Sequence, residues 1–430
     1  MLTFIPTRWL LAMCLPALLT TITYAQSLDK AVPQDAGLSA SALEKIDALL
    51  DQAVERKEIP GAVVLIARDG KLGYLRARGF QDVEAGKAIT NDTLFRIASM
   101  TKPITSVAVM ILVDDGKLKV TDPLSTYLPE FKNQKVLVQG TGAESKLVAA
   151  NRDITVHDLL THTSGLTYRF MAQKPFVELY SKADICDGLI RPSFTMAENM
   201  RHLAALPLLH QPGSAYQYGL STDVLGRLVE VVSGQDLETF MRKRIFEPLG
   251  MNDTFFDVPT DKASRLVAVY EHGEDKKIRR VGDNPVQKGE LIYCVTSPVR
   301  GQRGYCSGGG GLTSSAADYA RFLQMLLHHG EWNGKRILKP ETVRAMTSNQ
   351  IGNLPCMSPT DRFGYGFGIV TGTGKDQVSS PGTYYWGGFY STSFWVDPQK
   401  KLIGVLMMQL PPTPLTLHED FKKLVYQAIK

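Results

Sequence analysis

The sequence contains two tetrapeptides that place a serine three residues before a lysine, a spacing that can turn a hydroxyl into a nucleophile. They are Ser27-Leu28-Asp29-Lys30 and Ser99-Met100-Thr101-Lys102. About one such match is expected by chance in a chain of this length, so the surrounding residues must show which of the two is functional. Residues near an N-terminus are usually loosely held, and no apolar helix follows Ser27. We interpret the first tetrapeptide as the chance match.

The second tetrapeptide opens a predicted helix. Apolar residues continue at helical spacing up to Gly116, and Pro103 lies in the first turn, where a missing N–H costs little. Residues three apart share one face of a helix, so we expect the Lys102 amine within hydrogen-bonding reach of the Ser99 hydroxyl. A buried amine beside other donors loses basicity and can then accept a hydroxyl proton. The alternative is a helix-capping serine beside a solvated lysine.

Two later segments accompany this motif. The first is Pro212-Gly213-Ser214-Ala215-Tyr216-Gln217-Tyr218-Gly219-Leu220-Ser221, and the second is Tyr385-Trp386-Gly387-Gly388-Phe389 on a predicted strand. The three motifs resemble, in type and order, those of the serine β-lactamase and penicillin-binding-protein-like superfamily. The sequence is most similar to its family VIII carboxylesterases, which are class C β-lactamase-like. The resemblance runs from about Leu38 to the C-terminus.

The resemblance implies a role for each matching residue. Ser99 corresponds to the acylated nucleophile, Lys102 to its proton acceptor, and Tyr218 to the phenol that passes the proton to the leaving group. The N–H groups of Ser99 and Phe389 correspond to the oxyanion hole. Tyr216 is the lesser candidate for the phenol. Whether lysine or tyrosine is the base stays open, because the two groups titrate together.

Two departures from the family pattern concern the substrate. Leu220 stands where β-lactamases and peptidases carry asparagine, and Trp386 stands where they carry the lysine of Lys-Thr-Gly. Losing a charged partner for a substrate carboxylate could cost about 2 kcal/mol or more. We expect Leu220, Trp386, Gly387 and Gly388 to line a substrate site that favours neutral esters.

Other chemistries are not supported by the sequence. His157 and His162 are five residues apart, so the two do not share one helical face, and no metal-ligating motif occurs. The run Gly308–Gly311 is not followed by lysine, and we interpret it as a tight turn where backbones approach closely. Gly-x-Ser-x-Gly is absent from the sequence. We expect no metal and no cofactor.

The helices and strands that must position these residues are predicted from the spacing of apolar residues along the chain. Residues 40–54 predict a helix, and residues 62–66 and 72–80 predict a hairpin. Helical patterns then dominate to about Gly330, including 224–232, 237–246 stopped by Pro248, and 316–327. Strand patterns return at 365–371, 383–387, 390–396 and 402–408, before a closing helix over 417–429.

This order predicts an α/β fold with α+β layering, in the β-lactamase/transpeptidase-like class. An antiparallel sheet is built from the N- and C-terminal segments and flanked by helices, around an inserted, mainly helical domain. We assign 26–98 and 331–430 to the sheet domain and 99–330 to the helical domain, with the active site between them. Residues 131–153 and 257–304 are expected to be surface excursions.

Aromatic residues are scattered through the segment from Tyr168 to Met200. Tyr168, Phe170, Phe176 and Tyr180 alternate there with polar residues. The segment is expected either to form a lid with an acyl pocket or to pack its aromatics into the helical core.

Length and charge exclude other classes of protein. The 430 residues carry 48 basic and 43 acidic side chains without a long run of one sign, so no nucleic-acid partner is indicated.

Residues 1–25 show the order of a secretory signal peptide, and no membrane span is expected after its removal. We expect an exported protein, periplasmic or secreted. An uncleaved anchor, or a lipoprotein lipidated at Cys14, is the alternative.

Export makes disulfides possible for the remaining cysteines, Cys186, Cys294, Cys306 and Cys356. Cys294 and Cys306 are nearest in sequence and are the first candidates for a bridge. Equally, all four are small buried residues, because a chain this long has enough core without them.

These observations favour a serine hydrolase that cleaves small carboxylic esters through an acyl-Ser99 intermediate. A β-lactamase or D,D-peptidase on the same fold is an alternative, which needs another cation such as Lys375 or an arginine. A silent protein that binds peptidoglycan fragments is a third possibility. Transfer of the acyl group to an alcohol or amine is a variant of the first. The sequence indicates no oligomeric state.

Overall fold

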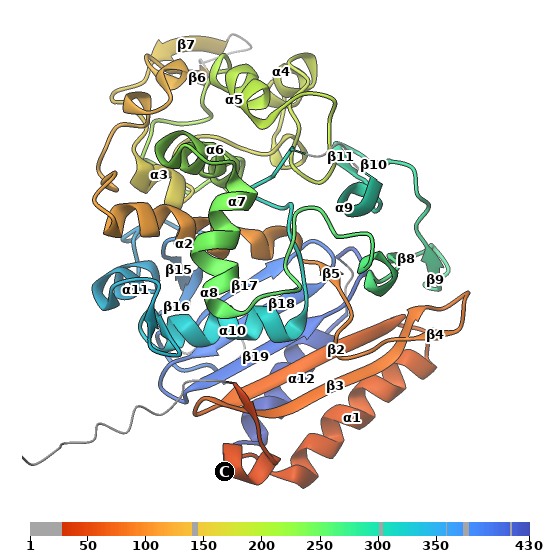
Figure 1. Cartoon of the computed structure of the whole chain (residues 1–430). Helices are drawn as coiled ribbons and strands as arrows, with labels where there is room; N and C mark the ends of the chain where they lie inside the picture. Colours follow the sequence, from red (N-terminus) through yellow and green to blue (C-terminus); the bar gives the residue numbers. More distant parts are fainter. Residues whose placement is uncertain (1–27, 140–144, 301–303, 358, 373–377, 413–414) are drawn as a thin grey trace, which may run out of the picture.

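The chain folds around a nine-stranded sheet that is built from both of its ends (Figure 1). This computed structural model describes residues 28–139, 145–300, 304–357, 359–372, 378–412 and 415–430. The strands lie in the order β1-β3-β2-β19-β18-β17-β16-β15, and β4 pairs with β3. All neighbours are antiparallel except β1 and β3. The strands are β1 Asp29–Lys30, β2 Gly61–Arg68, β3 Lys71–Asp82, β4 Lys87–Ala88, β15 Asp361–Phe363, β16 Gly368–Val370, β17 Tyr384–Gly388, β18 Thr392–Asp397 and β19 Leu402–Met407.

The pairing of β2 with β19 joins the two ends of the chain in the middle of the sheet. Leu65 pairs with Val405, and the register runs from Arg68 opposite Leu402 to Val63 opposite Met407. Neighbouring β2 side chains point to opposite faces, and both faces are buried, which accounts for the continuous apolar run in the sequence. The predicted sheet from both termini is confirmed.

Helices cover both faces of this sheet. α1 (Ala40–Glu55) and α12 (Leu417–Gln427) pack against each other on one face. α10 (Ala316–Leu327) packs on β2 and β19 from the other face, where α2 (Thr101–Asp114) shares its core. The helices predicted over 40–54 and 316–327 match the structure to within one residue, because each has a clear apolar stripe.

The middle of the chain forms a mainly helical layer above the sheet (Figure 1). α6 (Ser221–Ser233) packs on α2 and is the central helix of this layer. The remaining helices are α3 Val156–Leu160, α4 Phe176–Lys182, α5 Met196–Ala204, α7 Leu237–Met241, α8 Glu247–Leu249, α9 Ser297–Arg300 and α11 Pro340–Met346.

Short strand pairs form within the predicted surface excursions 131–153 and 257–304, and two further pairs lie outside them. The pairs are β5 Phe95–Arg96 with β12 Thr313–Ser314, β6 Lys135–Gln139 with β7 Ser145–Ala149, β8 Tyr270–His272 with β9 Ile278–Arg280, β10 Val286–Lys288 with β11 Leu291–Tyr293, and β13 Glu331–Trp332 with β14 Lys335–Arg336.

Two predicted boundaries are wrong. Pro248 does not stop the helix that begins at Leu237, because a π-helical turn at Arg242–Phe246 leads into α8, whose first turn tolerates the proline. The helix ends instead at Gly250, which adopts φ = 66°. The strand predicted over 365–371 is confined to Gly368–Val370, because the chain turns at Gly366 with φ = 90°.

The Cys294–Cys306 bridge suggested by the sequence is not formed. The Cys294 thiol lies 3.3 Å from the Thr296 hydroxyl, whereas Cys306 is buried in the large core that contains α2 and α6. Cys186 is also a buried thiol, and Cys356 is partly exposed with its Sγ 3.3 Å from the carbonyl oxygen of Asp361. Proximity in sequence was a poor guide, since these two cysteines belong to different packing environments.

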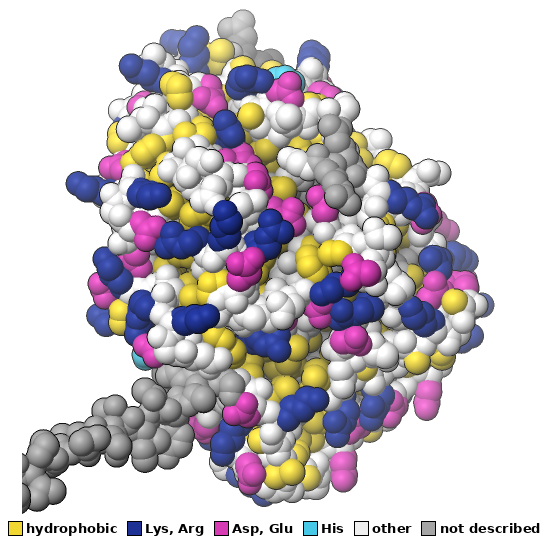
Figure 2. Space-filling view, viewed as in Figure 1, with side chains coloured by type: hydrophobic (Ala, Val, Ile, Leu, Met, Phe, Trp, Pro, Cys, Tyr) yellow, Lys and Arg dark blue, Asp and Glu magenta, His cyan; other side chains and the backbone are white. Residues whose placement is uncertain are grey.

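Residues 1–25, with Cys14, and Lys375 lie outside the described residues. Within the described ranges, none of the helices is both long and apolar enough to span a bilayer. Acidic and basic side chains are intermingled over the face of the molecule seen in Figure 2. This face therefore presents no single-sign field.

A partly buried histidine joins α12 to the sheet and predicts a pH dependence of stability. The Ser393 hydroxyl on β18 lies 2.7 Å from Nδ1 of His418, within hydrogen-bonding distance, and burial lowers the pKa of His418 to about 4. The unfolded chain takes up a proton near pH 6.5, whereas the folded chain keeps this ring neutral. The stability from this group is present above about pH 6.5 and is lost as the pH falls toward 4.

We expect the free energy of unfolding in urea to fall by about 2 kcal/mol more in the wild type than in His418→Asn between pH 7.5 and 5.0. Asparagine keeps a hydrogen-bonding group for Ser393 but has no titrating ring. His202→Asn, on the exposed face of α5, is the matched control and should follow the wild type. Equal losses in the wild type and His418→Asn would contradict the assignment.

Candidate active site

Ser99 lies on a tight turn at the start of α2. The turn spans Ala98–Met100, and Ala98 adopts φ = 41°, a left-handed conformation that residues other than glycine rarely occupy. Leu312 N–H donates to Thr101 Oγ1 at 3.1 Å, which fixes the first residue of α2. Ser99 is partly exposed, although Ala98 and Met100 beside it are buried. The turn therefore presents one hydroxyl at the surface of an otherwise closed segment.

Lys102 lies one helical turn further and is only 1% exposed. Its Nζ lies 3.2 Å from Ser99 Oγ and 2.6 Å from the carbonyl oxygen of Gly309, to both of which it donates. The spacing of three residues thus has the predicted effect. The glycine run that accepts the second hydrogen bond approaches α6 closely, since a Cβ on Gly308 would lie 2.6 Å from the Thr222 carbonyl oxygen. The expected close backbone approach at this run is confirmed.

Tyr218 lies in the loop before α6 and covers the lysine. Its ring centroid is 4.7 Å from Lys102 Nζ, within the range of a cation–π contact. The next residue, Gly219, passes Thr167 so closely that a Cβ would lie 2.5 Å from the Thr167 Cα. Only glycine fits there, and this close passage holds the phenol over the amine.

His162 packs against the Tyr218 ring, a supporting contact that the sequence analysis missed. The two ring centroids are 4.8 Å apart, and His162 is 1% exposed. Burial, together with the charge of Lys102, holds the pKa of His162 well below its usual range, so the ring is neutral near pH 7. Nothing in the sequence spacing of His162 links it to Tyr218.

Strand β17 passes beside the turn that carries Ser99. A Cβ on Gly388 would lie 2.3 Å from the carbonyl oxygen of Ile97, so glycine permits this approach. Trp386 points to the same side, with its ring 5.6 Å from Tyr218 and 5.2 Å from Phe363. It is 7% exposed, and its Nε1 has no hydrogen-bond partner among the described residues. Its exposed edge adds an apolar surface and no charge.

The other residues expected around the substrate differ in their exposure. Gly387, Gly388 and Phe389 are partly exposed at the end of β17. Leu220, by contrast, is completely buried in the core at the start of α6. The substrate-lining role expected for Leu220 is therefore wrong, because a side chain with no exposed surface cannot contact a substrate. The position closes the core beneath Tyr218 instead.

Tyr168 is the aromatic residue of the segment 168–200 that reaches this site. Its ring lies 5.3 Å from Lys102 Nζ and 5.5 Å from the Tyr218 ring. Phe176 and Tyr180 are buried in the core, as one of the two interpretations of the segment expected, and Phe170 stacks on Tyr168 at 4.9 Å.

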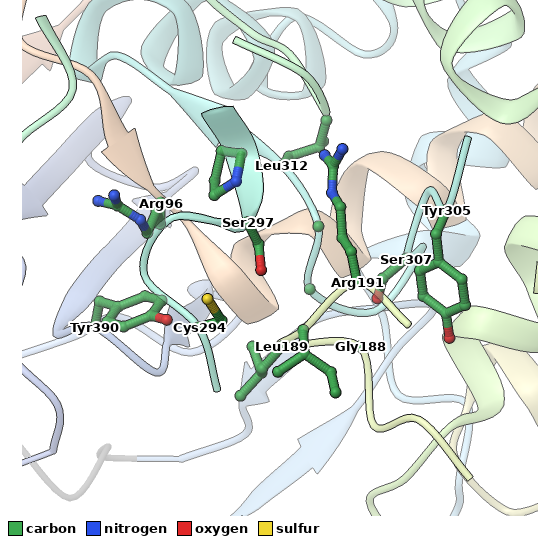
Figure 3. A pocket seen from close by; sticks show the side chains of 14 residues that line it. Arg96, Gly188, Leu189, Arg191, Cys294, Ser297, Tyr305, Ser307, Leu312 and Tyr390 are labelled. Atoms are coloured by element: carbon green, nitrogen blue, oxygen red, sulfur yellow. The ribbon is translucent and has the colours of Figure 1, made fainter. Parts of the chain in front are cut away.

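A cavity shares the wall formed by the glycine run, and Figure 3 shows its labelled side chains. Arg96, three residues before Ser99, belongs to this wall, but its guanidinium points away from Cys294 and Ser297 in the view. It donates to the carbonyl oxygens of Val295 and Val267 and to Gln409 Oε1. Arg96 is therefore engaged in holding loops and does not replace the lysine missing from the third motif.

Arg191, the second arginine of this cavity, is also engaged with protein groups. It pairs with Asp257 and donates to the Phe256 carbonyl oxygen. The described part of the cavity thus offers no arginine aimed at a substrate carboxylate near Ser99.

Taken together, the geometry combines an accessible hydroxyl, a buried amine and a phenol. A hydroxyl next to an amine can lose its proton during attack on a carbonyl, and a nearby phenol can return a proton to a leaving group. The Ser99 N–H at the start of α2 also favours negative charge nearby. This arrangement can carry out acyl transfer.

Comparisons with known proteins agree with this chemistry. A family model described as Beta-lactamase matches residues 46–427. Esterase EstB of Burkholderia gladioli is 35% identical over 385 residues, which is 87% of this chain and 91% of that protein. Lovastatin esterase of Penicillium rubens is 30% identical over 412 residues, which is 88% of this chain and 96% of that protein.

A solved structure described as EstCE1, a hydrolase with promiscuous acyltransferase activity, superposes with a TM-score of 0.80. It is 28% identical, and the match covers 90% of this chain and 98% of that one. The residues matched by the family model contain all three motifs and every strand of the large sheet except β1. The chain therefore belongs to the β-lactamase family, as a serine hydrolase of the esterase type.

Proposed function

We propose that this protein hydrolyses small neutral carboxylic esters through an acyl-Ser99 intermediate. The observation that carries the proposal is the contact of 3.2 Å between Lys102 Nζ and Ser99 Oγ beneath the Tyr218 ring. Ser99 Oγ attacks the ester carbonyl carbon while its proton passes to the Lys102–Tyr218 pair. The N–H groups of Ser99 and Phe389 stabilise the oxyanion.

The proton then moves from the Lys102–Tyr218 pair to the leaving group, and hydrolysis of the acyl-enzyme repeats the cycle. Tyr218 delivers the proton to the departing alkoxide, which leaves as an alcohol. Water then attacks the Ser99 ester, gives its proton to the same pair, and releases the carboxylic acid as Ser99 regains its hydrogen. An alcohol in place of water would give a new ester, as the description of EstCE1 suggests for that protein.

The preference for a neutral substrate rests on Trp386. It stands where a lysine binds the substrate carboxylate in β-lactamases and peptidases, and it packs against Tyr218 and Phe363. Both arginines near the glycine run are engaged with protein groups. A β-lactam or a peptide would leave its carboxylate without a cation, which is costly in a partly buried site.

We further propose that the protein is exported to the periplasm or secreted after cleavage behind Ala25. Residues 1–25 support this with a single charge at Arg8, an apolar stretch from Trp9 to about Leu19, and the small residue Ala25. The intact mass of protein purified from a bacterial host should correspond to a chain that begins at Gln26. A mass that includes residues 1–25 would contradict cleavage.

The nucleophile and the substrate class are tested together with purified protein. We expect wild type to hydrolyse a short-chain nitrophenyl ester at least about 100-fold faster than Ser99→Ala, because the acyl-enzyme cannot form without the hydroxyl. A chromogenic cephalosporin and a D-Ala-D-Ala peptide should be turned over far more slowly than the ester. A fluorophosphonate should label wild type and leave Ser99→Ala unmodified.

The outcomes separate the alternatives. Full ester turnover by Ser99→Ala would refute the nucleophile. Faster turnover of the cephalosporin or peptide would favour a β-lactamase or D,D-peptidase. Absence of both labelling and turnover would favour a silent binding protein.

The role of the phenol is tested by two single hydroxyl deletions in one loop. Tyr218→Phe should lower kcat by about 100-fold while the melting temperature is nearly unchanged, because its ring contacts remain. Tyr216→Phe is the matched control. The Tyr216 hydroxyl is buried without a partner among the described residues, so its removal should leave kcat and stability similar or slightly higher. Equal losses of kcat in the two variants would contradict a specific role for Tyr218.

A further inference from the structure

A buried carboxyl group that the proposed reaction does not use lies behind the catalytic lysine. Asp223, in the first turn of α6, has no exposed surface. An isolated charge in such a place is strongly disfavoured, so its surroundings must explain why an acid is kept there.

One contact of Asp223 connects it to the residue whose carbonyl group binds Lys102. Its Oδ1 accepts the Ser307 hydroxyl at 2.6 Å and the Gly309 N–H at 3.3 Å. The carbonyl oxygen of the same Gly309 accepts from Lys102 Nζ at 2.6 Å. Asp223 and Lys102 therefore bind opposite polar groups of a single residue.

The packing around Gly309 leaves no room to change this geometry. A Cβ on Gly309 would lie 2.3 Å from Asp223 Oδ2 and 2.9 Å from the Tyr168 hydroxyl. The carboxyl thus lies directly against the backbone that holds the lysine. Asp223 Oδ2 has no hydrogen-bond partner among the described residues, so half of the carboxyl is held by packing alone.

Some of the groups around Asp223 favour its ionised form, and others are neutral. Burial raises the pKa of Asp223, whereas the charge of Lys102 and the hydrogen bonds from Ser307 and Gly309 favour its ionised form. Cys186, Tyr305 and Tyr168 face the same carboxyl as neutral groups whose pKa values burial raises. His162 and Tyr218 face Lys102 from the other side.

Asp187 is the second acid of this group, and burial raises its pKa to about 7. It is bound differently, since its Oδ1 accepts the Arg169 N–H at 3.1 Å and the Arg169 side chain lies 3.7 Å from its Oδ2. Lys102 is therefore the cation that faces Asp223, and Arg169 is the cation that faces Asp187.

We propose that Asp223 is a positioning residue that orients the Gly309 carbonyl toward Lys102 and acts as the counter-ion of its ammonium form. The proposal rests on the proposed function of Lys102. When Ser99 attacks and Lys102 receives its proton, positive charge develops beside Gly309. A fixed carboxylate on the far side of that peptide stabilises the developing charge without contacting the substrate.

The test is the isosteric variant Asp223→Asn in the full-length enzyme. Asparagine Oδ1 still accepts from Ser307 and Gly309, so the change removes charge and keeps the hydrogen bonds. We expect kcat on a short-chain nitrophenyl ester to fall by about 10- to 100-fold with KM changed less than about threefold. The acid limb of the pH dependence of kcat/KM should move to lower pH, because the protonated amine loses its counter-ion.

Two further variants distinguish positioning from general damage. Asp187→Asn removes the neighbouring acid, which does not contact Gly309, and should keep kcat and the acid limb close to wild type. Ser307→Ala removes one of the hydrogen bonds that favour the ionised form of Asp223, so it should move both readouts in the same direction by a smaller amount. It also serves as the test if Asp223→Asn does not fold.

The acid limb decides the interpretation. An unchanged acid limb in Asp223→Asn and Ser307→Ala, or an equal shift in Asp187→Asn, would overturn the counter-ion role. Turnover that persists in Ser99→Ala would instead refute the proposed function, independently of Asp223. A shift of the limb in Asp223→Asn alongside Ser99-dependent turnover would support both.

Discussion

The site depends on keeping one lysine amine almost completely out of water beside a serine hydroxyl. Burying an ammonium group is expensive unless its hydrogen bonds and charge are compensated. Lys102 receives that compensation from the Gly309 carbonyl, from Ser99 and from two aromatic faces. Several parts of the helical layer make these contacts possible. α6 supplies the packing surface, the glycine run supplies the carbonyl, and the loop before α6 supplies the phenol.

The aromatic groups around the lysine form a connected layer. Tyr218 contacts Tyr168, His162 and Trp386, and Trp386 in turn contacts Phe363 on the neighbouring part of the sheet. Rings exclude water and still attract a cation, which a purely aliphatic wall would not do. The tryptophan thus belongs to the support of the phenol as much as to the substrate surface. This dual role explains how the third motif can lose its lysine and remain part of the site.

The sequence predicted what local geometry determines. The Ser99–Lys102 contact follows from helical spacing alone, and the long helices and the sheet strands follow from clear periodicity. The burial of Leu220 was not predictable, because the direction of a side chain at a helix start depends on what packs against it. His162 and Asp223 were missed for a similar reason: both reach the lysine through partners distant in sequence. The cysteines show the same limit, since pairing depends on distance in space.

The way the sheet is closed also has a consequence for how the protein is made. β2 obtains its second partner only when β19 has been synthesised, and Gly388 approaches Ile97 only when the chain is nearly complete. Contacts between such distant segments form slowly, because the intervening chain must first be ordered. On a ribosome, the N-terminal hairpin therefore waits with an unpaired apolar edge until the last strands emerge. The central sheet therefore cannot close until translation is almost finished.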